Sequence, residues 1–165
     1  MDWIDALGEA WEREFPGVDV STLPPLVRLA RLSLLIESFQ QGVLEPFELT
    51  RSDYGVLAML RRAGAPYEAS PSDLTNRLLR SSGGMTKILK RLASAGFVER
   101  VPDPSDGRVS WVRLTEAGHK VQDEVFSAFL AATRRLLAPV SAAELREVDD
   151  SLKVLLDAFE PPPSA

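Results

Sequence analysis

Basic side chains are concentrated in the middle of this 165-residue chain, where they could bind a polyanion. Residues 74–114 contain eight arginines and lysines and three carboxylates, so this segment has a net charge of +5. The whole chain has a net charge of −5, so the remaining residues sum to −10. Cations that bind phosphates release condensed counterions, and a basic segment within an acidic protein therefore indicates a polyanionic partner on one face. The basic residues are Arg77, Arg80, Lys87, Lys90, Arg91, Arg100, Arg108 and Arg113.

Residue types that support catalysis or metal binding are scarce. The sequence has no cysteine, which excludes disulfides, thiolate metal sites and thiol redox sensing. Its one histidine, His119, cannot build a multi-histidine metal site and is interpreted as an ordinary residue near a helix start. We find no Ser-His-Asp set, no phosphate loop and no metal-ligand spacing. The sequence therefore predicts a protein that is not an enzyme and that uses no metal and no cofactor.

Start and stop signals divide the chain into helices and one β-hairpin. Thr50 and Ser141 each precede a carboxylate three residues later, Asp53 and Glu144, a spacing typical of a capping box. Alternating β-formers on both sides of an Asp-Gly turn predict two strands. The expected helices are 2–14, 23–44, 50–63, 70–80, 82–95, 115–138 and 141–159, and the expected strands are 97–101 and 109–114. This order predicts a mainly α fold with a small β-hairpin wing, that is, a winged helix-turn-helix joined to a helical dimerisation region.

The helix expected at 82–95 is the candidate recognition helix. Its N-terminal end offers small side chains, hydroxyls and free backbone N–H groups, which permit close approach to a phosphate or a groove. Lys87, Lys90 and Arg91 are spaced to reach phosphates or guanine edges. The alternative is an ordinary amphipathic helix with a solvated basic face, and the wing that follows favours the DNA-binding interpretation.

The hairpin turn carries Asp106 and Arg108, two residues apart. Arg108 follows a glycine at a polar tip, where Asp106 could orient its guanidinium; the alternative is a surface ion pair of little energetic value. An oriented arginine on a projecting tip suits the narrow, negative minor groove of A·T-rich DNA. The sequence thus predicts a sequence-specific DNA-binding protein. Its predicted DNA-binding residues are Ser81, Ser82, Gly83, Thr86, Lys87, Lys90, Arg91, Asp106 and Arg108.

The long helix expected at 23–44 is apolar on nearly every side. Such a helix is buried on more than one side, which in a small protein predicts a subunit interface. No apolar run approaches the roughly 18 residues that span a membrane, and the acidic first residues are unlike a signal peptide. We therefore expect a cytoplasmic homodimer with no membrane partner.

Three segments of the basic region resemble the winged helix of the MarR family of bacterial transcriptional regulators: SSGGMT, RLASAGFVERVPDPSD and the DGR…RLTEAG of the wing. The resemblance implies one domain over 1–165, with dimerisation helices at 1–48 and 115–165 and the DNA-binding winged helix-turn-helix at 49–114. It implies a homodimer that binds a pseudo-palindromic operator in double-stranded DNA, usually as a repressor that a small-molecule effector releases. In this family's roles Arg108 would enter the minor groove, Asp106 would orient it, and the recognition helix would face the major groove.

The extra N-terminal helix, which contains Trp11, resembles the branch of the family that includes urate-responsive and PecS-like regulators. The resemblance implies that Trp11 contacts the ligand, whereas a helix-to-core contact is the alternative. Aligning the motifs places Gly55 and Ile88 where that branch has an aspartate and an arginine. A buried anion without its cationic partner binds poorly, so the sequence predicts a regulator of this architecture that does not respond to urate.

Two other functions fit a winged helix. One is a protein-interaction module, which has no need of a basic wing. The other is a non-specific architectural DNA-binding protein, which would bind operator and random DNA alike, whereas a specific regulator prefers its operator by roughly 10³ or more.

Overall fold

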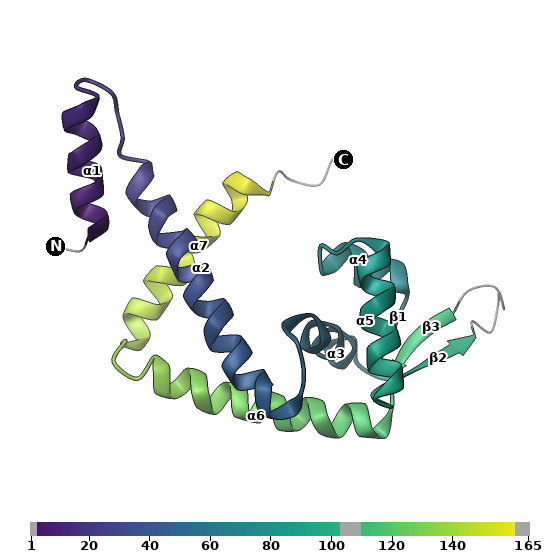
Figure 1. The fold of residues 1–165 in the computed structure, drawn as a ribbon. Coiled ribbons are helices and arrows are strands. Elements are labelled where there is room, and N and C mark those ends of the chain that lie inside the picture. The colour runs from purple at the N-terminus through teal and green to yellow at the C-terminus, as the bar shows by residue number, and fades with distance from the viewer. Residues whose placement is uncertain (1–2, 103–109, 161–165) are drawn as a thin grey trace. The chain divides into compact units, whose positions relative to one another are not determined.

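The computed structural model describes residues 3–102 and 110–160. The chain divides into two compact units, Met1–Phe126 and Ser127–Ala165. Helices predominate, as Figure 1 shows. The elements are α1 (Trp3–Glu14), α2 (Leu23–Leu44), the short 3-10 helix η1 (Glu45–Phe47), α3 (Arg51–Arg62), β1 (Glu68–Ala69), α4 (Pro71–Arg77), α5 (Ser82–Ser94), β2 (Val98–Pro102), β3 (Ser110–Leu114), α6 (Glu116–Leu136) and α7 (Ala142–Phe159). The predicted fold class, mainly α with a small β wing, is confirmed.

The N-terminal helix α1 packs against α2. Asp5 of α1 forms an ion pair with Arg28 of α2. The Arg31 guanidinium of α2 lies 5.6 Å from the centre of the Trp3 ring, a cation–π distance. Polar and aromatic contacts therefore supplement the apolar contact between these two helices.

Side-chain caps set the starts of the helices, as the sequence predicted. Thr50 and Asp53 form a complete capping box at the start of α3, and Ser141 and Glu144 form another at the start of α7. The hydroxyl and the backbone N–H of Ser141 hold the pKa of the Glu144 carboxyl below its usual range. Each box satisfies two backbone N–H groups that the first helical turn leaves without a carbonyl partner.

The helix-turn-helix consists of α4 and α5. Ser70 caps α4 and Ser81 caps α5. The prediction that the first of these helices extends to about residue 80 was wrong, because α4 ends at Arg77 and the chain then leaves the helical conformation. Leu79 has a left-handed φ of 49°, which turns the backbone into the start of α5.

The wing belongs to a sheet of three strands in the order β1-β3-β2. β2 and β3 are antiparallel, with Val98 opposite Leu114 and Pro102 opposite Ser110. The sequence predicted only these two strands and missed β1, whose two residues are too short to show an alternating pattern. An ion pair between Glu68 and Arg113 fastens β1 to β3, with 2.7 Å between the charged atoms.

The apolar core lies among α3, α4, α5 and the sheet. Each fully buried aliphatic side chain contributes about 1.5–3 kcal/mol, so this core is the main stabilising feature of the module. Its buried members are Leu44, Leu49, Val56, Leu57, Leu60, Ala69, Leu74, Met85, Ile88, Leu89, Leu92, Val98, Val112, Leu114 and Val125. None of the helices in the described part of the chain has both the length and the apolar character needed to cross a bilayer.

The start of α6 packs directly on the backbone that follows α5. A Cβ atom added to Gly118 would lie 2.0 Å from the carbonyl oxygen of Phe97, a distance that no side chain tolerates. Thr115 reinforces this contact, because its backbone N–H donates to Phe97 and its hydroxyl donates to the carbonyl of Gly96. Only glycine at 118 therefore permits this joint between α6 and the segment that follows α5.

We expect Gly118→Ala to lower the free energy of unfolding by about 1–3 kcal/mol or more, because the added methyl overpacks the joint. Urea unfolding followed by circular dichroism measures this. Gly83→Ala is the control, since a Cβ there meets nothing within 4 Å; its effect should stay within about 0.5 kcal/mol. Equal unfolding midpoints for the two variants would contradict the proposed close approach.

Candidate nucleic-acid interface

The helix α5 separates an apolar side from a polar side. Its buried residues, Met85, Ile88, Leu89 and Leu92, recur at three- and four-residue steps and face the core. The predicted DNA-binding residues of this region are all exposed. They are Ser81, Ser82, Gly83, Thr86, Lys87, Lys90 and Arg91. Lys87 and Lys90 lie away from the buried side of α5, and their role in DNA binding stays a prediction.

The N-terminal end of α5 is open. The Ser81 hydroxyl accepts from the Gly84 N–H at 3.2 Å, and the Thr86 hydroxyl donates to the Ser82 carbonyl at 2.9 Å. Ser82 and Gly83 are the first two residues of α5, and their N–H groups have no carbonyl partner within the helix. Since no atom lies within 4 Å of where a Gly83 side chain would begin, a phosphate can approach this backbone closely.

A groove of about 440 Å³ runs beside α5 and the wing. Its lining includes Thr86 and Lys90 from α5 and Arg100 from β2. The Arg100 guanidinium donates to the Ser110 hydroxyl across the hairpin at 2.8 Å. The residue-by-residue prediction omitted Arg100, although the charge count of the basic segment included it. The structure adds it to the same surface as Lys90.

Asp106 and Arg108, the two predicted wing residues, lie outside the described residues. The strands that carry the tip are in register up to its edges, where Pro102 faces Ser110. The predicted roles of Asp106 and Arg108 remain predictions.

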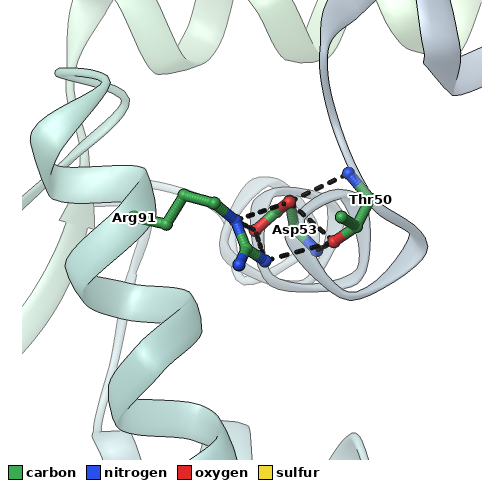
Figure 2. Close-up of polar contacts among 3 residues, drawn as sticks. All are labelled: Thr50, Asp53 and Arg91. Atoms are coloured by element: carbon green, nitrogen blue, oxygen red, sulfur yellow. Dashed lines mark hydrogen bonds and ion pairs between the residues drawn. The ribbon is translucent and has the colours of Figure 1, made fainter.

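Arg91 has a protein partner that the sequence reasoning missed. Its guanidinium meets the carboxylate of Asp53 at the start of α3, as Figure 2 shows, with 2.6 Å between the charged atoms. Asp53 is 1% exposed, whereas the Arg91 side chain is half exposed. The sequence identified Asp53 only as a helix cap, because nothing in the spacing of residues 53 and 91 indicates that they meet.

The two partners of this ion pair contribute unequally to its energy, because Asp53 is buried and Arg91 is half exposed. Removing one partner of a fully buried pair costs about 3–5 kcal/mol, since the other charge is left without compensation. Water reaches Arg91 and screens part of the interaction, so the cost here falls below that range. The buried carboxylate depends on the arginine more than the arginine depends on the carboxylate.

The residues considered for a ligand are separate from this surface. Trp11 is 43% exposed on α1, and its ring centre lies 5.4 Å from that of Phe15. Ile88 is buried in the core, and a Cβ on Gly55 would contact Leu78 at 3.4 Å. An apolar core contact thus occupies the position where the resemblance would place a ligand-binding arginine, and the role of Trp11 stays a prediction.

A cavity of about 310 Å³ lies between α3 and α6, lined among others by Tyr54, Ala58, Arg61 and Phe126. Gln122 also lines it, and the side-chain oxygen of this buried residue has no hydrogen-bond partner within the described part of the protein. A buried polar atom without a partner is costly, which favours a hydrogen-bond donor in this space. No group of histidine, cysteine, aspartate or glutamate side chains that could hold a metal ion occurs among the residues described.

Comparisons with known proteins agree with this geometry. The sequence profile of the MarR family matches residues 47–109. The transcriptional regulator PecS of Dickeya dadantii is 34% identical over 141 residues, which are 86% of this chain and 85% of PecS.

Two crystal structures share the fold. AbsC, a MarR family regulator from Streptomyces coelicolor, has a TM-score of 0.75 and 24% identity, over 86% of this chain and 96% of AbsC. A cysteine-to-serine variant of MarR from Escherichia coli, complexed with operator DNA, has a TM-score of 0.70 and 27% identity, over 84% of this chain and 99% of that one. From the similarity to PecS over most of both chains and the matched family profile, the chain belongs to the MarR family of winged helix-turn-helix transcriptional regulators.

Proposed function

We propose that this regulator binds a pseudo-palindromic operator in double-stranded DNA as a homodimer and acts as a repressor that a small-molecule effector releases. The observation that carries the proposal is the exposed face of α5, where hydroxyls, open backbone and cations gather opposite the buried side. The operator complex of the related MarR supports it. Half-sites one helical turn apart, ~34 Å, fit a two-fold protein.

Each residue of the interface has a proposed role. Ser81, Ser82 and Gly83 meet a phosphate at the end of α5, while Thr86, Lys87 and Lys90 enter the major groove or bind its phosphates. Arg100 adds a cation beside Lys90. From the resemblance, Arg108 enters the minor groove and Asp106 orients it.

The dimer is proposed from apolar surface that the single chain leaves open. α2 buries only Leu44, although it is rich in aliphatic residues, and Leu34 is 68% exposed. α7, taken by itself, has no buried residue, yet it carries exposed Leu156 and Phe159. Large apolar patches on both ends of a chain are typical of a subunit interface. We infer that 1–48 and 115–165 supply the dimerisation helices and 49–114 the DNA-binding module of one domain.

The effector is proposed to occupy the cavity beside Gln122. Its aromatic and apolar walls suit a small aromatic molecule, and Arg61 and the Gln122 oxygen supply polar contacts. We also infer that the protein is not an enzyme, because its relatives are transcriptional regulators. We infer that it is cytoplasmic, because bacterial operators lie on DNA in the cytoplasm.

A fluorescence-anisotropy titration tests the function. The full-length protein is titrated against the intergenic DNA beside its own coding region and against a scrambled duplex. We expect nanomolar binding to the first and at least ~10³-fold weaker binding to the second. Equal, salt-sensitive affinity for both would indicate an architectural DNA-binding protein, and binding to neither would favour a protein-interaction module.

Lys90→Ala should weaken operator binding and reduce the slope of log K against log salt concentration by about 0.9, the value for one phosphate contact. Lys120→Ala is the matched control, since Lys120 is also exposed but lies on α6. The same titration, repeated between 50 and 200 mM salt, measures both. An unchanged slope in Lys90→Ala would remove Lys90 from the interface.

Urate should leave the operator complex intact, because Gly55 and the buried Ile88 supply neither of the charged groups that the resemblance calls for. The measurement is a urate titration of the preformed complex, followed by anisotropy. Dissociation at micromolar urate would contradict this prediction.

A further inference from the structure

We propose that Asp53 is a positioning residue for the recognition helix, which it holds in register through Arg91. This inference rests on the proposed function, since the register matters only if α5 reads DNA. Asp53 is buried and would touch no DNA. Arg91 accordingly affects DNA binding mainly by restraining the position of α5, because its guanidinium is bound to Asp53.

The hydrogen bonds around Asp53 form a directional fork. Arg91 Nε donates to both carboxylate oxygens at 3.0 and 3.1 Å, and Nη2 donates to Oδ1 at 2.6 Å. Nη2 also donates to the hydroxyl of Thr50 at 3.2 Å. A planar guanidinium bound in this way is fixed in both distance and orientation, which a point charge is not.

The carboxylate that receives the fork is itself fixed. Asp53 Oδ2 accepts from the backbone N–H of Thr50 at 2.9 Å and from its hydroxyl at 2.6 Å. Its own backbone N–H donates to the Thr50 hydroxyl at 3.2 Å. The next turns of α3 bury Val56, Leu57 and Leu60 in the core. Asp53 is therefore held both by the cap and by the packed helix that carries it (Figure 2).

The hydrogen-bonded fork between Arg91 and Asp53 adds an oriented polar contact to the apolar packing of α5. Burial of Met85, Ile88, Leu89 and Leu92 stabilises α5 and determines which side of the helix faces the core. The fork adds a directional polar contact at the edge of that packed side. Arg91 is one residue from Lys90 and one helical turn from Lys87. Holding its guanidinium therefore restrains the rotation of α5, and with it the side of the helix on which these two lysines lie.

A direct DNA contact by Arg91 makes the opposite prediction. If Arg91 binds a phosphate, Asp53 competes with DNA for the guanidinium, and Asp53→Asn should tighten binding. If Asp53 positions α5, Asp53→Asn should loosen it. The sign of this one change decides between the two roles.

The test compares Asp53→Asn, Arg91→Lys and Arg91→Gln with the wild type in the operator and scrambled-duplex titrations, at several salt concentrations. Arg91→Lys keeps the charge and removes the fork, so it remains informative if Asp53→Asn folds poorly. The matched control is Asp73→Asn. Asp73 caps α4 at the same helix position through the hydroxyl of Ser70, but it is exposed.

We expect Asp53→Asn and Arg91→Lys each to lose about tenfold in operator affinity, the value of one misplaced contact, and to lose preference over the scrambled duplex. The salt slope should stay unchanged, and Asp73→Asn should bind as the wild type does. Operator binding by Asp53→Asn that equals or exceeds the wild type overturns the proposal. So does a slope lowered by about 0.9 in Arg91→Gln, which assigns Arg91 to a phosphate.

A second measurement needs no DNA. Hydrogen exchange of the α5 amides should accelerate in Asp53→Asn and not in Asp73→Asn, because only the first loses the fork. Unchanged exchange overturns the positioning role. A wild type that fails to prefer its operator overturns the proposed function instead, and the two failures are distinguished in this way.

Discussion

The contact between α3 and α5 determines where the basic face points, and the rest of the module depends on it. Apolar residues of both helices enter one core, which supplies most of the stability. At the start of α3 the buried carboxylate of Asp53 binds Arg91, which supplies the orientation. The packed core thus supplies the stability and sets which side of α5 is buried, and the ion pair adds a directional contact at the edge of that core. A DNA-reading surface needs both, because an error in helix rotation misplaces every cation on it.

The basic residues of the chain are concentrated in one segment, and the rest of the chain is acidic. The net charge of +5 in 74–114 stands within a chain whose remainder sums to −10. Several of the cations have structural partners: Arg91 binds Asp53, and Arg113 binds Glu68. Lys87 and Lys90 lie on the exposed side of α5, and Arg100 lies beside the groove. The charge available for DNA is therefore smaller than the sequence count, and the proposed DNA contact uses the cations of α5 and Arg100.

Local signals made most of the fold predictable, and distant contacts account for the rest. The caps at Thr50 and Ser141 and the period of α5 are properties of a few neighbouring residues, and all three predictions were confirmed. β1 was missed because its two residues are too few to show an alternating pattern, and because its partner strand is distant in the sequence: Glu68 pairs with Arg113, 45 positions away. The partner of Arg91 was missed because it too is distant in the sequence, 38 positions away. The exposed side of α5 could be predicted from the three- and four-residue spacing of its apolar residues. The role of Arg91 could not, because it depends on a contact with Asp53 of α3.

The helix α3 also connects the interface to the cavity proposed for the effector. At its start it holds Arg91, and near its end Arg61 pairs with Asp123 of α6 and lies 3.1 Å from a ring nitrogen of His119. The cavity beside Gln122 lies between these same two helices. α6 begins at the Gly118 joint, where it contacts the backbone that follows α5. A ligand that binds one separation of α3 and α6 better than another would therefore act on the C-terminal part of α5 by two routes, through Asp53 and through the Gly118 joint. Such differential affinity is the condition for any effector to release DNA.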